Sequence, residues 1–185
     1  MKTTRIFICT LFILTLFVGS ASAEKAPQKV YDLADSTLAA VGSDPAVVAA
    51  VKAQNAEGKS LADIQAMDAK WKAQAGVVDY MAALMDSALG KHLKAIQAKE
   101  AYYAEIFVMD NQGANVAMTD KTSDYWQGDE GKFKNSFAGG KGAVFVDEVE
   151  FDDSSQTYLV QVSVPVMDGG KAIGAITFGI DVDKI

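Results

Sequence analysis

Polar, charged and aromatic side chains gather between residues 121 and 130, directly after two runs of strand-forming residues. Loops that a rigid sheet holds in place are where binding groups tend to lie. The segment offers an ammonium group, two carboxylates and two aromatic rings for contact with a small molecule, from Lys121, Asp124, Asp129, Tyr125 and Trp126. These five residues are therefore the first candidates for a ligand-binding site.

The strand expected at residues 172–180 has two unlike faces. Alternation of side chains along a strand places the small and polar residues on one face, namely Ala175, Thr177, Gly179 and Asp181. The other face is bulky and apolar, and we expect it to pack on helices. The small face leaves room either for a ligand, which adds Thr177 and Asp181 to the candidates, or for the covering loop, with Trp126 as a core residue.

Residues suited to catalysis or to metal binding are scarce. The single histidine, His92, lies among apolar residues at helical spacing, which favours a structural role, and the single cysteine, Cys9, lies near the N-terminus. Zinc sites and most pairs of nucleophile and base need such residues. A serine with a lysine base, or carboxylate catalysis, stays open without a recognisable spacing. We expect no enzyme activity, no catalytic residue and no cofactor.

An acidic cluster surrounds the polar turn expected at residues 152–156, namely Asp147, Glu148, Glu150, Asp152 and Asp153. Calcium takes several oxygen ligands, so a calcium site is one interpretation. In a regular strand, however, residue 147 faces away from 148, 150 and 152, and the Asp-x-Asp-x-Asp-Gly loop of calcium sites is absent. A solvated sheet face is the favoured interpretation, and we predict no metal site.

The N-terminus has the features of a secretory signal peptide. Lys2 and Arg5 precede an apolar segment, residues 6–18, and small residues precede Glu24, so we expect cleavage after Ala23 and a periplasmic or secreted protein. Removing 23 of the 185 residues leaves one domain, residues 24–185. Without Lys2 and Arg5, 15 of the 17 basic residues remain against 24 acidic ones, a net charge of −9. Such a charge repels phosphate backbones, so we expect no nucleic acid partner.

The hydrophobic pattern changes period near residue 104. Residues 24–103 predict helices at about 30–41, 45–55, 61–76 and 77–100. The remainder, residues 104–185, predicts strands at 106–109, 115–119, 143–151, 158–166 and 172–180, with a short helix at 129–137. We expect Pro165 to end its strand or to place it near an edge. Helices followed by strands indicate an α+β fold, with N-terminal helices packed on a five-stranded antiparallel sheet.

This order of elements resembles that of the extracytoplasmic Cache domains, the PAS-like sensing modules of chemoreceptors and sensor kinases. The motifs that carry the resemblance are residues 106–113 (IFVMDNQG), the pair Tyr125-Trp126, residues 162–166 (VSVPV) and residues 172–176 (AIGAI). The chain looks like a small, stand-alone, secreted protein with a single Cache domain. The resemblance implies a ligand against one sheet face, under the loop and the short helix between the second and third strands.

By the same resemblance, Tyr125 and Trp126 match the aromatic pair that walls the pocket. Family members that bind amino acids also have an Arg before this pair and an Asp on the last strand. Here the nearest cation is Lys121, and the position on the last strand is Gly179, with Asp181 two residues further on. These departures argue against an ordinary α-amino-acid site.

The function expected from the sequence is therefore a periplasmic or secreted module that binds or senses a small polar molecule and has no output domain of its own. The alternative is an interaction subunit that docks on a membrane receptor or sensor kinase without binding a ligand itself. The long first helix could also support a homodimer.

Overall fold

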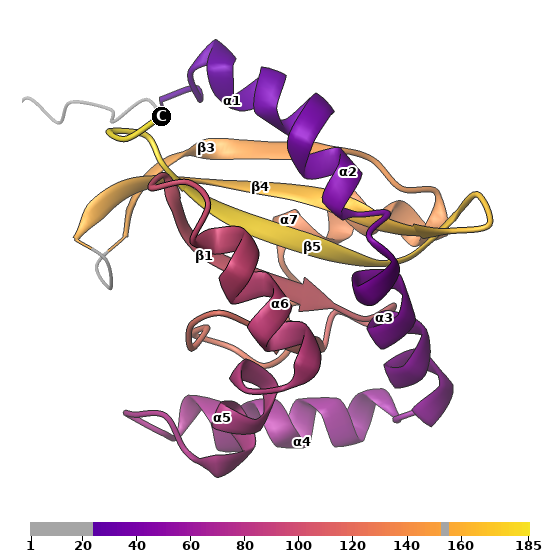
Figure 1. The fold of residues 1–185 in the computed structure, drawn as a ribbon. Coiled ribbons are helices and arrows are strands. Elements are labelled where there is room, and N and C mark those ends of the chain that lie inside the picture. The colour runs from indigo at the N-terminus through magenta and orange to yellow at the C-terminus, as the bar shows by residue number, and fades with distance from the viewer. Residues whose placement is uncertain (1–23, 153–155) are drawn as a thin grey trace, which may run out of the picture.

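The computed structural model describes residues 24–152 and 156–185, so the predicted signal peptide and Asp153 lie outside the described residues. Within them the sheet has five strands in the order β2-β1-β5-β4-β3, and every neighbouring pair is antiparallel. The strands are β1 (Tyr103–Met109), β2 (Asn115–Met118), β3 (Phe145–Asp152), β4 (Thr157–Asp168) and β5 (Lys171–Asp181). Strand β5 thus lies at the centre of the sheet, between β1 and β4 (Figure 1).

The helices precede the sheet in the chain, apart from one. A first helical run comprises α1 (Gln28–Leu33), the π-helical turn η1 (Ala34–Leu38) and α2 (Ala39–Val41). It is followed by α3 (Pro45–Glu57), α4 (Leu61–Lys72), α5 (Asp79–Met85) and α6 (Ala88–Gln97). Between β2 and β3 lie α7 (Gly131–Phe137) and the 3₁₀ turn η2 (Ala138–Gly140). The predicted α+β fold, with N-terminal helices on a five-stranded antiparallel sheet, is confirmed.

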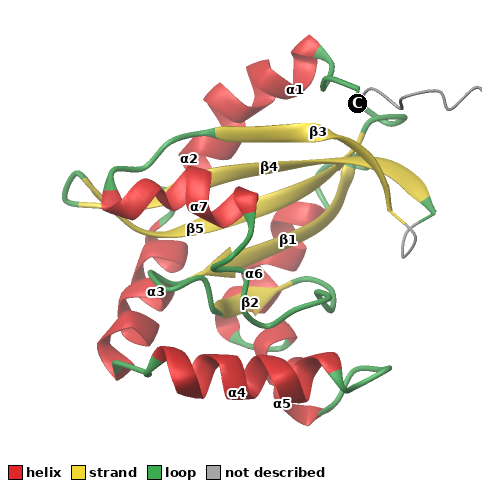
Figure 2. Cartoon of the chain, turned by 180° about the vertical axis from the view of Figure 1, so that it is seen from behind, coloured by secondary structure: helices red, strands yellow, loops and turns green. Residues whose placement is uncertain are grey.

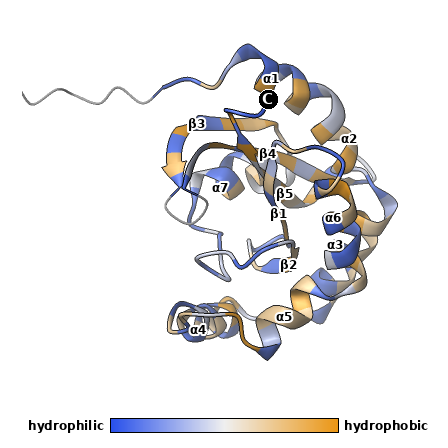
Figure 3. Cartoon of the chain, turned by 60° about the vertical axis from the view of Figure 1, so that its left-hand side comes forward, coloured by the Kyte–Doolittle hydropathy of each residue, from blue (hydrophilic) through white to orange (hydrophobic). Residues whose placement is uncertain are grey.

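The two faces of the sheet have different coverings. Helices α1, α3 and α6 pack on one face, where Val30, Val51 and Leu93 contact strand residues such as Ile176 and Phe178 in one buried cluster. Helices α1 and α3 carry both hydrophobic and hydrophilic residues (Figure 3). Helix α7 and the loop after β2 lie on the opposite face (Figure 2). The bulky side of β5 therefore faces the helices, as expected, and its small side faces α7 and the loop.

The helix predicted at residues 77–100 is in fact two helices, α5 and α6. The Ser87 hydroxyl accepts a hydrogen bond from Gly90 N at 2.9 Å and so begins a new helix. Gly90 also lies against the end of α5, because a Cβ at this position would be 2.4 Å from Leu84 O. The periodicity continues across this turn, which is why the sequence pattern did not reveal it.

Strand β4 continues through Pro165 to Asp168, so the prediction that Pro165 ends the strand is wrong. The alternative prediction, that Pro165 lies near an edge of the sheet, is confirmed. The pairing of β3 with β4 stops at Ser163, whereas Pro165 pairs with Ala175 of β5. Proline is tolerated there because β4 has a hydrogen-bonded neighbour on one side only.

Candidate ligand-binding site

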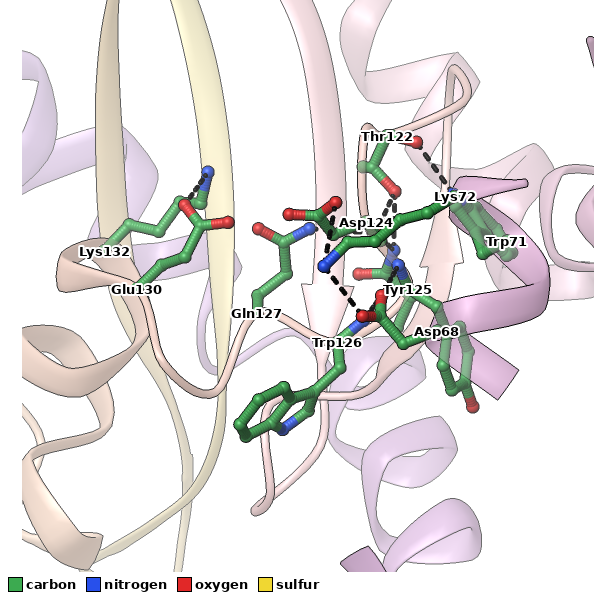
Figure 4. Close-up of polar contacts among 11 residues, drawn as sticks. Asp68, Trp71, Lys72, Thr122, Asp124, Tyr125, Trp126, Gln127, Glu130 and Lys132 are labelled. Carbon is green, nitrogen blue, oxygen red and sulfur yellow. Dashed lines mark hydrogen bonds and ion pairs between the residues drawn. The ribbon is translucent and has the colours of Figure 1, made fainter. Parts of the chain in front are cut away.

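Two side chains of α4 hold the backbone of the loop after β2, residues 119–130 (Figure 4). Asp68 Oδ1 accepts hydrogen bonds from Tyr125 N at 2.9 Å and from Trp126 N at 3.1 Å. Trp71 Nε1 donates to Thr122 O at 2.8 Å. Asp68 and Trp71 are both buried and lie three residues apart, on one side of the helix. Helix α4 therefore fixes the path of the loop.

Lys72 neutralises the carboxylates at this anchor. Its Nζ lies 2.8 Å from Asp68 Oδ2 and 3.4 Å from Asp124 Oδ1. The hydrogen bond with Asp68, together with the charge of Asp124, raises the pKa of Lys72 above its ordinary value, although partial burial opposes the shift. The Asp124 carboxylate is thus engaged with α4.

The predicted aromatic pair also contacts the protein itself. The Tyr125 ring is buried against Trp71, with 5.6 Å between ring centroids. Trp126 Nε1 donates to Gln112 O at 2.7 Å, and its indole lies close to Gly128, where an added Cβ would be 2.3 Å from Nε1. Trp126 in this way joins the loop to the turn between β1 and β2.

A cavity of about 290 Å³ lies between this loop, α7 and the sheet. We call it the inner cavity; its lining residues are Glu105, Phe107, Lys121, Thr122, Ser123, Gln127, Lys132, Asp152 and Gln161. A second cavity of about 340 Å³, the outer cavity, shares Glu105, Lys132, Asp152 and Gln161 with it. Their volumes lie close to the lower limit of the range for ligand sites, about 300–1,000 Å³, and so suit a small molecule.

Gln127 carries an unsatisfied polar atom at the inner cavity. Its side chain is only 1% exposed, and its Nε2 donates to Asp124 O at 2.9 Å. Among the described residues, no donor reaches its Oε1, which lies on the side of the amide away from Asp124 (Figure 4). Buried polar atoms are almost always hydrogen-bonded, and an unmade bond costs about 1–3 kcal/mol. A ligand that donates a hydrogen bond here would remove this cost.

A chain of polar contacts crosses the floor of both cavities. Gln161 Nε2 donates to Glu105 Oε1 at 3.3 Å, and Gln161 Oε1 accepts from Lys132 Nζ at 3.0 Å. Lys132 Nζ also lies 2.9 Å from Glu130 Oε2 and 5.6 Å from the centroid of the Phe107 ring. Strands β1 and β4 and helix α7 thus present a carboxylate, an amide and an ammonium to the same space.

The position of Glu105 disfavours the ionised form of its carboxyl group. Burial is the main cause that raises the pKa of Glu105, and repulsion from Asp152 and Asp120 adds to it, while Lys132 and Gln161 lower it. The net shift is upward from an ordinary value of 4.5. A positive group in the cavity would favour the ionised form, so Glu105 is suited to meet a cation or a hydrogen-bond donor.

Sequence reasoning did not identify Glu105, Gln127, Lys132 or Gln161 as site residues. A usable signal was present for two of them. Glu105 is a charged residue in the otherwise apolar or aromatic strand β1, and Gln161 lies between Val160 and Val162 in β4. A polar residue in a buried strand needs a partner, which is a reason to examine the face it shares.

The residues that were predicted from sequence are not brought together around one cavity. Lys121 lines the inner cavity, and its Nζ donates to Gln74 O at 3.1 Å. Thr177 is buried on the same sheet face, with Oγ1 2.7 Å from Ser163 Oγ. Asp181 lies at the end of β5 and pairs with Lys184 at 2.7 Å, whereas Asp129 is exposed.

The acidic residues of β3 differ from the prediction in one respect. Asp147 was expected to face away from Glu148, Glu150 and Asp152, yet all four line the outer cavity, so that expectation is wrong. The physical reason is an irregularity in the pairing between Val146 and Val149, which interrupts the alternation. Across residues 24–152 and 156–185, no group of three or more acidic or histidine side chains is arranged to hold a metal ion.

A larger cavity of about 520 Å³ lies on the helix side, at the junction of α2, α3 and α6. Its main polar groups are paired with each other, because His92 Nε2 lies 3.0 Å from Asp44 Oδ2. Burial alone would raise the pKa of Asp44, but hydrogen bonds from Ala46 N and His92 outweigh it and lower that pKa. The described residues that line this cavity have no buried, unpartnered side-chain atom. We therefore place the candidate site on the loop side.

Comparisons with known proteins give matches to solved structures. No protein-family model and no curated protein sequence matches the chain. The part of the chain that the structure describes has no helix both long and apolar enough to span a membrane.

Three of the matching structures are sensory or ligand-binding domains of receptors and a kinase. One is the ligand-binding domain of the amino acid chemoreceptor PctC of Pseudomonas aeruginosa in complex with GABA, 16% identical over 66% of this chain, with a TM-score of 0.40. The sensor domain of the V. cholerae histidine kinase DctB is 12% identical over 84%, with a TM-score of 0.39. The sensory domain of the Campylobacter jejuni chemoreceptor Tlp3 with isoleucine bound is 15% identical over 83%, with a TM-score of 0.39. The chain spans 57%, 58% and 60% of the length of these structures, respectively.

Proposed function

We propose that this protein is a ligand-binding sensory module that holds a small polar molecule in the inner cavity. The observation that carries the proposal is the buried Oε1 of Gln127, which lacks a donor among the described residues and belongs to a residue that lines that cavity. A preformed cavity with a few convergent polar groups is the usual form of a small-molecule site. In this proposal Glu105, Gln127 and Gln161 accept or donate hydrogen bonds to the ligand, and Lys121 lies at the loop side.

The residues of the loop anchor have an indirect role in this proposal. Asp124, Tyr125 and Trp126 hold the loop over the cavity through their contacts with α4 and with Gln112. The protein acts without catalysis, as a single domain exported by the N-terminal signal peptide to the periplasm or beyond. Its signal then passes through a membrane receptor or sensor kinase.

Binding can be tested by a thermal-shift screen of carboxylates, amines, purines and sugars, followed by calorimetry of each hit. A ligand at a hundred times its Kd stabilises the folded state by about 2.7 kcal/mol, which is easily detected. The variant Gln127→Met keeps the length of the side chain but removes the acceptor, together with the donor to Asp124 O, and should weaken binding. Gln65→Met changes an exposed residue of α4 and serves as the control. Absence of any hit, or equal affinities of both variants, would contradict the proposal.

A second candidate function is that of an interaction subunit. Phe151 and Tyr158 are 49% and 52% exposed, and their rings meet edge to face at 5.2 Å on the hairpin of β3 and β4. The double variant Phe151→Ser, Tyr158→Ser should then lose co-purification with a receptor or kinase from membranes while retaining its fold. A homodimer through the first helix stays a prediction that light scattering can test.

A further inference from the structure

Negative charge is in large excess around the outer cavity. Among the described residues that line it, six carry carboxylates, namely Glu105, Glu130, Asp147, Glu148, Glu150 and Asp152. Lys132 provides an ammonium, which Glu130 already holds at 2.9 Å. A cavity lined by one sign of charge concentrates ligands of the opposite sign. An anion is therefore disfavoured in the outer cavity and a cation is favoured.

The position of Lys132 shows that a primary ammonium fits between the two cavities. Its side chain is only 11% exposed. Its Nζ contacts a carboxylate oxygen of Glu130, the amide oxygen of Gln161 and the face of Phe107. A carboxylate, a neutral acceptor and an aromatic face are the partners that a primary amine uses.

The acceptors of the inner cavity independently favour a ligand with a hydrogen-bond donor. Gln127 Oε1 is buried and lacks a donor among the described residues, and a carbonyl oxygen can only accept. The Glu105 carboxylate, at the boundary of both cavities, is also an acceptor when ionised. A ligand group that carries N–H or O–H groups would therefore suit these acceptors of the inner cavity.

The arrangement of the carboxylates favours an extended cation over a metal ion. Asp147, Glu148 and Glu150 follow one another along β3, and no group of three acidic side chains among the described residues converges as metal ligands do. Calcium needs six to eight oxygen atoms at 2.3–2.6 Å around one point. Charges spread along a strand match a molecule whose positive groups are themselves separated.

We propose that the ligand is an aliphatic diamine or polyamine, with one ammonium in the inner cavity near Glu105 and Gln127 and another along the acidic residues of β3. This inference rests on the proposed function, because it concerns the same site. In this proposal the acidic side chains of β3 select a ligand with more than one positive charge.

The test is calorimetry of the full mature protein with putrescine and spermidine, beside butylamine, succinate, GABA and calcium. We expect 1:1 binding of the two polyamines and weaker binding of butylamine, which lacks the second charge. The double variant Glu148→Gln, Glu150→Gln should lower the affinity for spermidine by about tenfold, from two exposed ion pairs. The double variant Asp35→Asn, Asp79→Asn changes the net charge equally at exposed, distant positions and should have little effect.

A substitution of Lys132 separates two classes of ligand most clearly, because the expected change in affinity has opposite directions for a polyamine and for a carboxylate. If the ligand is a polyamine, Lys132→Gln removes a competing positive charge, and the affinity should be unchanged or higher. If the ligand is a carboxylate held by Lys132, the same substitution should abolish binding. Binding of succinate or GABA alone would overturn this inference and leave the proposed function standing, whereas the absence of binding by any compound class would overturn both.

Discussion

Glu105 of β1 and Gly179 of β5 lie opposite each other in the sheet, and the side chain of Glu105 fills the space that the glycine leaves. A Cβ at Gly179 would be 2.7 Å from Glu105 Cγ. Gln161 of β4 is the partner of Gly179 on its other side. The two polar side chains therefore meet above the central strand, where Gln161 Nε2 reaches Glu105 Oε1 at 3.3 Å.

The first prediction concerns this glycine. Gly179→Ala should displace the Glu105 side chain and break its contact with Gln161, so the affinity for ligand should fall by about tenfold while the free energy of unfolding falls by about 1–3 kcal/mol. Calorimetry and thermal unfolding measure the two effects. Gly76→Ala is the control, since a Cβ there has no atom within 4 Å. Ligand affinity unchanged by Gly179→Ala would mean that the Glu105–Gln161 pair does not form the site.

The second prediction concerns the pH dependence of stability. The pKa of Glu105 is raised in the folded state, chiefly by burial, so the folded protein binds this proton more tightly than the unfolded chain does. Stability from this group is therefore lost as the pH rises from about 4.5 through the raised pKa, and the deficit persists at neutral pH. Glu105→Gln should raise the melting temperature of the free protein at pH 7.5.

The same difference should shrink below pH 4, where the carboxyl group is protonated in both states. Thermal unfolding at the two pH values measures it, and Glu100→Gln, at an exposed position, is the control. A lower melting temperature of Glu105→Gln at pH 7.5 would show that contacts with Gln161 and Lys132 outweigh the cost of burial.

The third prediction concerns the anchor on α4. Asp68→Ala removes the acceptor of two backbone N–H groups, of Tyr125 and Trp126, and should lower the free energy of unfolding by about 3 kcal/mol. Asp68→Asn keeps an oxygen at that position and loses the charge that pairs with Lys72, so it should cost less. Urea unfolding of both variants measures the difference. Equal losses would mean that the ion pair with Lys72, and not the backbone hydrogen bonds, holds the loop.

The fourth prediction separates two roles of Trp126. Trp126→Phe removes the hydrogen bond to Gln112 O and should lower the free energy of unfolding by about 1 kcal/mol, without a change in ligand affinity. Tyr158→Phe, at an exposed ring, should change neither quantity. A large loss of affinity in folded Trp126→Phe would instead show that the ring contacts the ligand, as the family resemblance implies.

The sequence predicted the architecture because the signals for it are local. Alternation along β5 and helical spacing from residue 30 onward reflect which side of each element is buried, and the structure has these elements. The break between α5 and α6 escaped detection because the helical spacing of apolar residues continues across it, although the Ser87 cap that begins α6 is itself a local feature. Strand β4 extends further than predicted, past Pro165. The length of β3, and not Pro165 itself, decides where β4 has a second neighbour.

The site was less predictable because its members come from separate parts of the chain. Glu105 and Gln161 are 56 residues apart and meet only because β1 and β4 flank β5. The aromatic pair at 125–126 drew attention by residue type, but its orientation depends on Asp68, 57 residues before Tyr125. Single residues in one loop could be proposed from sequence, whereas their partners required the order of strands in the sheet.

That order of strands also sets the sequence in which the protein can assemble. The hairpin of β1 and β2 and the hairpin of β3 and β4 are joined into one sheet through β5, the last strand to be synthesised of the five described. Until residues 171–181 emerge, the two hairpins have no common neighbour, and Glu105 and Gln161 have no surface on which to meet. Binding competence should therefore arise in a single late step, once the last of the five described strands has been released.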